Sequence, residues 1–176
     1  METNHNPVLE NLRYKSASGA LDFSGIRYLL IRPETLVEIQ KVIEEKFGSE
    51  AAHEIFYQSG FRGTSLTAGK LLDSGLTPRE CLEAMFRMGA HLGWGKFELP
   101  NMETVGKENI EVTIHGSPFA RAYGAAEQPV CAILSGALAG IFSSLLGAVY
   151  ICNEVGCAVS GDASCTFRLV KRPSND

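Results

Sequence analysis

Three cysteines and one glutamate in the C-terminal half of the chain have the types and spacing of metal ligands. Cys131, Glu154, Cys157 and Cys165 follow one another at intervals of 23, 3 and 8 residues, and a Gly-Asp turn precedes the last of them. A hairpin in this region would bring two thiols and a carboxylate together, and Cys131 would supply the fourth ligand. Zinc is held by such ligands in a closed tetrahedron that leaves no position for water. The spacing therefore predicts a structural zinc rather than a catalytic one.

Two other interpretations of the cysteines remain open from the residues alone. Free cysteine is among the most buried residue types and packs as a small hydrophobic residue, an interpretation that fits Cys81 and Cys152 best. Zinc-bound thiolates can also be oxidised with loss of the metal, which would make the cluster a redox switch. The pattern is not a double Cys-x-x-Cys motif, so spacing alone does not decide between zinc and buried thiols.

The composition is that of one folded domain. The chain has 176 residues, of which 45% are hydrophobic and 20% are charged. A compact chain of 19.0 kDa exposes ~8,400 Å² and buries about 70% of its surface. Residues 1–20 are polar, and we expect them to be a mobile N-terminal segment before a single domain at residues 21–172. They contain no apolar run of a signal peptide, so we expect a cytoplasmic protein.

The charge distribution argues against direct binding to nucleic acid. The net charge is −4, and lysines and arginines are scattered singly apart from one pair near the C-terminus. Proteins that bind nucleic acid concentrate these residues on one face.

The elements that must position the cluster can be placed from periodicity and capping signals. Apolar residues three and four apart predict a helix after Pro33, and Gly48 is its expected end. Thr77 and Glu80 form a capping-box pattern with a proline between them. The full expectation is a strand at 25–31; helices at 33–47, 49–59 (with a weak continuation through 60–75), 78–93 and from 118; and strands at 94–99, 110–114 and 165–170, with a turn at 100–108. Because helices and strands come in runs, the fold class is predicted as α/β of the α+β type, a mostly antiparallel sheet with helices on one face.

The segment between Glu127 and Glu154 contains no charged residue and is long enough to span a bilayer. It also contains a proline, several serine and cysteine side chains, and no basic flank, all of which argue against a membrane span. We therefore expect a buried helix at 130–146 followed by a strand.

Six residues are candidates for contact with a ligand. His91 could orient a polar ligand group, although a cation at the end of a helix is also a common cap. Aromatic side chains could line an apolar cavity, although at such spacings they more often belong to the core; these are Trp94, Phe97, Phe119, Tyr123 and Phe142.

Several motifs together resemble the 4-vinyl reductase domain family over roughly residues 50–170. They are Gly93-Trp94-Gly95-Lys96-Phe97-Glu98, Ser117-Pro118-Phe119-Ala120, Pro129-Val130-Cys131, Gly136-x-x-x-Gly140 and Glu154-x-x-Cys157-x-x-x-Gly161-Asp162-x-x-Cys165-x-Phe167. The resemblance implies a fold shared with the Bet3-like subunits of vesicle-tethering complexes, a homodimer, and a small hydrophobic or aromatic ligand in an interior pocket. In related sensory domains of transcription activators, three cysteines and a glutamate bind zinc, and the four residues named first occupy those positions.

The resemblance also implies a function. We expect a sensor or carrier that is not an enzyme, with any output passing through a regulatory protein partner. The alternative is a reductase or accessory protein acting on a vinyl tetrapyrrole, but the sequence contains no recognisable flavin or nicotinamide site. Phenol-sensing relatives have a ligand-contacting histidine near His91 and a tryptophan near Pro118 that helps to hold the phenol hydroxyl. Proline cannot do this, so an apolar or larger ligand is expected.

Overall fold

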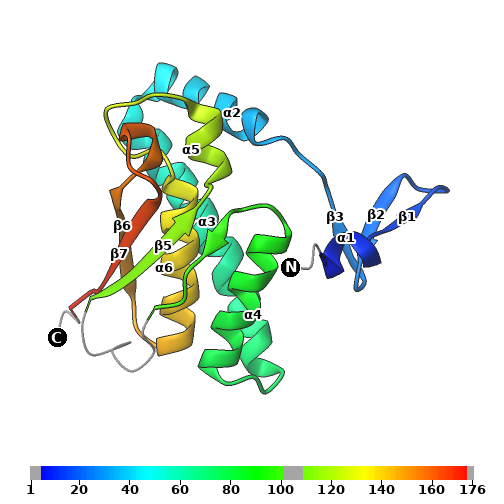
Figure 1. Cartoon of the computed structure of the whole chain (residues 1–176). Helices are drawn as coiled ribbons and strands as arrows, with labels where there is room; N and C mark the ends of the chain where they lie inside the picture. Colours follow the sequence, from blue (N-terminus) through cyan, green and yellow to red (C-terminus); the bar gives the residue numbers. More distant parts are fainter. Residues whose placement is uncertain (1–4, 101–108, 174–176) are drawn as a thin grey trace.

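The computed structural model describes residues 5–100 and 109–173, and its N-terminal part forms an extended arm. This arm, residues 5–31, contains α1 (Pro7–Asn11) and the strands β1 (Arg13–Lys15), β2 (Ala20–Phe23) and β3 (Ile26–Tyr28). The three strands pair only with one another, antiparallel and in chain order, and the arm stands away from the body (Figure 1). It is tied to the body where Asn6 Nδ2 donates to the carbonyl of His91 at 2.9 Å.

The arm corrects two expectations. Residues 5–20 are not without structure, because Asn6 caps α1 through its side chain and β1 pairs with β2. The strand expected at 25–31 covers only Ile26–Tyr28 and joins the small sheet rather than the main one. The protein exposes 10972 Å², against the ~8,400 Å² of a compact chain of this mass, and the extended arm contributes to the difference.

Five helices form most of the body. They are α2 (Pro33–Phe47), α3 (Ser49–Asp73), α4 (Pro78–His91), α5 (Pro118–Tyr123) and α6 (Ala132–Leu146). The capping box before α4 is present, with Thr77 accepting from the backbone of Glu80 while the Glu80 side chain accepts from the backbone of Thr77. Ser117 caps α5 as expected. The predicted helix at 49–59 and its weak continuation form one helix, α3, and the uncharged segment forms α6.

The main sheet is antiparallel in the order β4-β5-β7-β6. Its strands are β4 (Lys96–Phe97), β5 (Ile110–His115), β6 (Tyr150–Gly156) and β7 (Cys165–Lys171), with a short 3₁₀ helix at Ala158–Ser160 before β7. The strand expected at 94–99 is reduced to two residues, because Gly93 and Gly95 have φ of 87° and 114° and interrupt the extended backbone. The turn expected at 100–108 lies outside the described residues apart from position 100.

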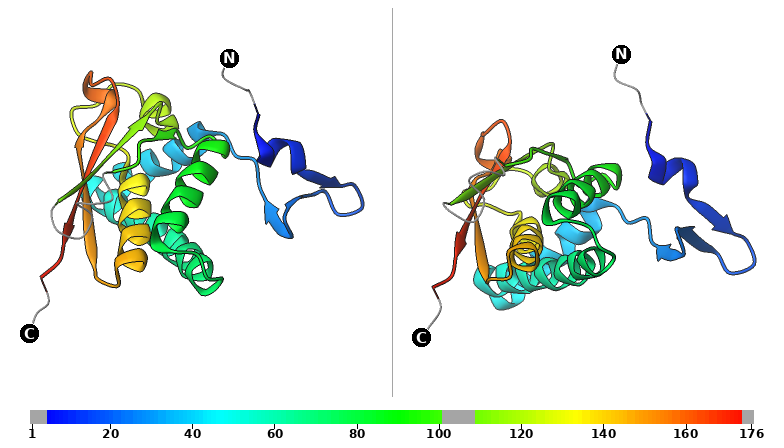
Figure 2. Two further views of the ribbon diagram at one scale, coloured as in Figure 1. Left: turned by 60° about the horizontal axis from the view of Figure 1, so that its bottom comes forward. Right: turned by 90° about the horizontal axis from the view of Figure 1, so that it is seen from below.

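Helix α6 lies at the centre of the body, between the sheet and α3 (Figure 2). Eleven of its residues are buried, so it is apolar on nearly every face, as is typical of a helix surrounded by protein. Its glycines allow close contact with α3: a Cβ on Gly136 would lie 1.9 Å from the carbonyl oxygen of Tyr57. Within residues 5–100 and 109–173, no helix has the length and apolar character needed to cross a membrane. The α+β class with helices on one face of an antiparallel sheet is confirmed.

Candidate metal centre and ligand cavity

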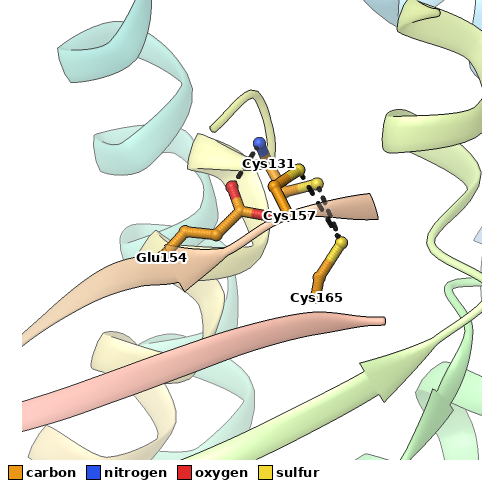
Figure 3. A group of neighbouring side chains, drawn as sticks. All are labelled: Cys131, Glu154, Cys157 and Cys165. Carbon is orange, nitrogen blue, oxygen red and sulfur yellow. Dashed lines mark hydrogen bonds between the residues drawn. The ribbon is translucent and has the colours of Figure 1, made fainter. Parts of the chain in front are cut away.

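The four predicted metal ligands converge on one point (Figure 3). One ligand atom from each of Cys131, Glu154, Cys157 and Cys165 lies within 4.8 Å of every other. The Sγ atom of Cys165 is 3.8 Å from that of Cys131 and 3.9 Å from that of Cys157. Two sulfurs bound tetrahedrally to zinc at ~2.3 Å would be about 3.8 Å apart. The spacing of the thiols therefore matches that of a zinc tetrahedron.

Three separate elements position these side chains. Cys131 is the N-cap residue of α6, Glu154 lies on β6, and Cys165 begins β7. Between the two strands the chain turns at Gly161, whose φ of 98° requires glycine. Asp162 Oδ2 accepts from the backbone N–H of Cys157 at 3.0 Å and fixes the third thiol over the turn. The cluster thus joins the start of the central helix to two adjacent strands.

The carboxyl group of Glu154 has one satisfied oxygen and one that is not. Its Oε2 accepts from the backbone N–H of Cys131 at 2.8 Å, whereas Oε1 is buried with no hydrogen-bond partner. Burial and the neighbouring Cys157 thiol together raise the pKa of Glu154 to about 8. A buried oxygen without a partner is costly, and a cation beside it would remove that cost.

The thiols share negative charge unequally. Hydrogen bonds from Cys131 and Cys165 lower the pKa of the Cys157 thiol. The corresponding bond to Cys157 raises the pKa of Cys131, and burial adds to this increase. The bond to Cys131 lowers the pKa of Cys165, but the bond to Cys157 and burial outweigh it, and the result is a pKa of about 12. With no cation present one thiolate is therefore favoured, since like charges repel; a divalent cation fits this donor set because it would allow the others to ionise.

The other two cysteines have the environment of core residues. Cys81 and Cys152 are 0% and 1% exposed. Burial raises the pKa of both thiols, which makes them poor nucleophiles.

A cavity of about 550 Å³ lies between α3, α4 and α6. Its lining includes no Asp, Glu, Lys, Arg or His among the described residues. The hydroxyl groups of Ser59, Thr64 and Thr67 line it, but each donates to a carbonyl of its own helix. Most of the remaining wall is apolar, from Ile26, Tyr28, Leu71, Ala84, Met85, Phe86, Met88, Leu92, Trp94, Phe97, Ile133, Leu134, Ala137, Leu138 and Ile141. Such a wall favours an uncharged, apolar ligand.

Only two of the six predicted ligand residues, Trp94 and Phe97, lie in this wall. Phe119 packs edge-on against Trp94 at 5.4 Å between ring centroids and is one layer further out. Phe142 is 0% exposed within the core. The side chain of Tyr123 donates to Glu44 Oε2 at 2.6 Å on another face. His91 ends α4 outside the lining, so a predicted role in orienting a polar ligand group lacks support from its position.

The sequence analysis missed the residues of α3 and α4 that shape the cavity. Met85 and Met88 lie three residues apart on α4, and Gly60 and Gly63 lie three apart on α3. Glycines inside a helix destabilise it by roughly 0.5–1 kcal/mol, so their presence in the middle of α3 was the available signal for a special packing or binding role.

Comparison with known proteins supports the same family. Residues 110–171 match the model of the 4-vinyl reductase domain. The chain is 24% identical over 184 aligned residues, 96% of its length, to the phenol regulator MopR of Acinetobacter guillouiae. It spans 31% of that protein, so this relative is about three times longer.

Three solved structures share the fold. The phenol-responsive sensory domain of the transcription activator PoxR, crystallised with phenol, has a TM-score of 0.76 and 22% identity, covering 93% of this chain and 86% of that one. A vinyl-4-reductase family protein from Methanocaldococcus jannaschii has a TM-score of 0.61 and 16% identity, over 83% and 84% of the two chains. Subunit 3 of the trafficking protein particle complex of Naegleria fowleri, covalently bound to palmitic acid, has a TM-score of 0.54 and 12% identity, over 80% and 95%. The resemblance inferred from the motifs is therefore confirmed: the chain carries a 4-vinyl reductase domain at residues 110–171, within a fold shared with Bet3-like subunits.

Proposed function

We propose that the chain is a sensor or carrier domain that binds a small hydrophobic or aromatic molecule in the cavity between α3, α4 and α6. The observation that carries this proposal is the cavity of about 550 Å³ with no charged side chain in its described lining. The similarity to a phenol regulator and to a phenol-responsive sensory domain supports a sensing role rather than catalysis. Because that regulator is longer than this chain, we expect the output to pass through a regulatory protein partner.

Binding should depend on the uncharged state of the ligand. Burial of apolar surface contributes about 25 cal/mol per Å², whereas a charged group without a partner loses far more on leaving water. Toluene and benzoate have similar shapes and differ in charge, so they form a matched pair. We expect toluene to bind and benzoate to bind at least about a hundredfold more weakly, a difference of roughly 3 kcal/mol.

The cavity offers a variant with a matched control on the same helix. Gly63 lines the cavity, and a Cβ there would contact nothing within 4 Å. Gly63→Leu should fill the space and abolish toluene binding, as measured by calorimetry. Gly69→Leu adds the same side chain on α3 at a position outside the cavity lining and should leave binding intact. Equal loss in both variants, or no loss in either, would show that the ligand binds elsewhere.

We propose further that Cys131, Glu154, Cys157 and Cys165 hold one structural zinc. The support is the convergence of four ligand atoms within 4.8 Å and the buried Glu154 Oε1 that lacks a partner. The metal would supply a fixed link between the start of α6 and the β6–β7 hairpin. Metal analysis of protein purified without added metal should give about one zinc per chain. Cys165→Ser should lose the metal and much of its thermal stability, whereas Cys81→Ser, at a buried cysteine outside the cluster, should retain the metal.

A thiol redox switch is a second candidate for the same cluster. The observation that favours it is the separation of 3.8 and 3.9 Å between the Cys165 sulfur and its two neighbours, together with the lowered pKa of Cys157. Thiolates of low pKa are the ones that peroxide oxidises. Release of zinc by mild peroxide, reversed by a thiol reductant, would favour this function; resistance to peroxide would leave the structural role alone.

We also propose that the chain forms a homodimer through its N-terminal arm. Large apolar side chains on the arm are exposed to an unusual degree: Tyr14 by 67%, Leu29 by 80% and Leu30 by 69%. Exposed apolar side chains that gather in one region mark an interaction surface, and a second copy of the chain presents the same arm. The excess surface noted above supports the same conclusion. Sedimentation analysis of the full chain tests it.

A further inference from the structure

A second hollow lies on another side of α6 and shares no lining residue with the ligand cavity. It is a cleft of about 600 Å³ between the end of α2, the first turns of α3, the loop before α6, the first turn of α6 and β6. Helix α6 contributes Ala132 and Ser135 to the cleft, but Ile133, Leu134 and Ala137 to the cavity. The cleft is therefore a separate space, and the proposed ligand of the cavity does not account for it.

The described lining of the cleft carries a strong excess of negative charge. Glu44, Glu50, Glu127 and Glu154 contribute carboxyl groups, His53 contributes the one imidazole, and no lysine or arginine lines it. Glu154 belongs to the metal cluster, which leaves three carboxyl groups for other contacts. Such a concentration of one sign of charge attracts a ligand of the opposite sign.

One of these carboxylates is held in place by neighbouring groups. Glu44 accepts from Gln40 Nε2 at 2.9 Å and from the hydroxyl of Tyr123 at 2.6 Å. Gln40 is itself buried and also donates to the carbonyl of Val130 at 3.3 Å. The nearest lysine, Lys41, is occupied elsewhere, because its Nζ donates to the carbonyl of Tyr123 at 3.1 Å and lies over that ring. The carboxylate is thus positioned without a cation of its own.

Ser135 provides an independent sign that a ligand belongs in the cleft. It is 1% exposed, and its Oγ has no hydrogen-bond partner. Buried polar groups are nearly always paired, and an unpaired hydroxyl is costly. The hydroxyls that line the other cavity are paired with helix carbonyls, so the unpaired state of Ser135 is not a general feature of this fold. Glu154 Oε1, the other buried atom without a partner in the described residues, is accounted for by the metal cluster.

We infer that this cleft binds a small alkylamine, with its ammonium group between the carboxylates and the Ser135 hydroxyl. An ammonium group is a donor only, and it matches carboxylate and hydroxyl oxygens that can accept. Apolar side chains in the same lining, Ala126, Pro129, Val130 and Ala132, would contact the methylene groups of the ligand. A short diamine combines both features, since it has a charge at each end and an apolar chain between them.

Calorimetric titration of the full chain with putrescine tests this inference, and 1,4-butanediol is the uncharged control of equal length. We expect putrescine to bind at one site per chain and the diol not to bind. Glu127→Gln and Glu50→Gln should each weaken binding about fivefold, and Ser135→Ala about tenfold. Glu45→Gln removes the same charge from a residue of α2 outside the cleft and should leave the affinity unchanged.

Three results would overturn the inference. Failure of putrescine to bind excludes an amine site, and equal weakening by Glu45→Gln and Glu127→Gln indicates diffuse attraction to an acidic protein. Tight binding of a lysine-containing peptide without binding of free amines would assign the cleft to a protein partner instead. Zinc content measured in each variant shows that the metal cluster is intact. Gly63→Leu should not alter putrescine binding, so failure of the proposed cavity ligand and failure of this inference are distinguishable.

Discussion

Replacing Gly136 by alanine tests the contact that places α6 against α3. A Cβ at this position would lie 1.9 Å from the carbonyl oxygen of Tyr57 and 2.6 Å from its carbonyl carbon. A carbon and a carbonyl oxygen normally approach to about 3.3 Å, so the two helices would have to separate by about 1.4 Å. The atoms in the way are backbone atoms, which cannot turn aside as the end of a side chain can. Overpacking of this kind costs about 1–3 kcal/mol, and the gain in helix propensity offsets about 0.5–1 kcal/mol of it.

We therefore expect Gly136→Ala to lower the free energy of unfolding by about 2 kcal/mol, taking the upper part of that range. In a chain of this size the melting temperature would fall by about 4–8 °C. Gly69→Ala is the matched control: it makes the same substitution within α3, where a Cβ meets nothing within 4 Å. There only the helix propensity changes, so stability should rise by about 0.5–1 kcal/mol. Thermal melts and urea titrations of both variants decide the matter, and equal stability of Gly136→Ala and the native chain would refute the contact.

Three further outcomes are expected. Glu154→Gln should bind zinc more weakly by about tenfold or more, because it replaces a carboxylate ligand by a neutral amide; native-like zinc content by metal analysis would remove Glu154 from the site. The hydrogen bond to Glu44 raises the pKa of Tyr123 to about 12 from 10.0. The protonated phenol is thus favoured by folding, so its stabilising contribution is complete below pH 10 and is lost as the pH rises toward 12. Urea titrations should show a smaller loss of stability over this range for Tyr123→Phe than for the native chain, and identical losses would contradict the bond. Leu29→Asp with Leu30→Asp should shift the sedimentation of a dimer toward that of a monomer without lowering the melting temperature of the body, whereas an unchanged mass would exclude this surface.

The sequence predicted best those elements whose signals are local. The capping box at Thr77 and Glu80 satisfies backbone N–H groups within four consecutive residues, so no distant partner is needed to predict it. The cap at Ser117 is equally local. The metal cluster was predictable for a related reason: Glu154, Cys157 and Cys165 lie on one hairpin, and the chain between them determines most of their approach.

The remaining features depend on contacts between distant segments. Strand β3 has the composition of a strand, but nothing in residues 26–28 shows that its partner is β2 of the arm rather than the main sheet. The aromatic candidates failed as cavity residues for a similar reason. Phe142 and Ile141 are adjacent on α6, yet one is in the core and the other lines the cavity. Since adjacent helix positions are about 100° apart around the axis, the direction of the cavity must be known before either can be assigned.

Helix α6 explains why the uncharged segment was the hardest part of the sequence to interpret. An amphipathic helix shows which face is buried, but this helix meets the sheet, α3, the cavity and the metal cluster on different sides and has no solvent face to mark with charge. Its small residues record these contacts instead: Gly136 and Gly140 touch the backbone of α3, and Ala137 faces the cavity. Its first turn meets both the metal cluster at Cys131 and the acidic cleft at Ser135. A displacement of α6 by a ligand in the cavity would therefore move a metal ligand and a cleft residue with it, which gives the three spaces of this fold one shared structural element.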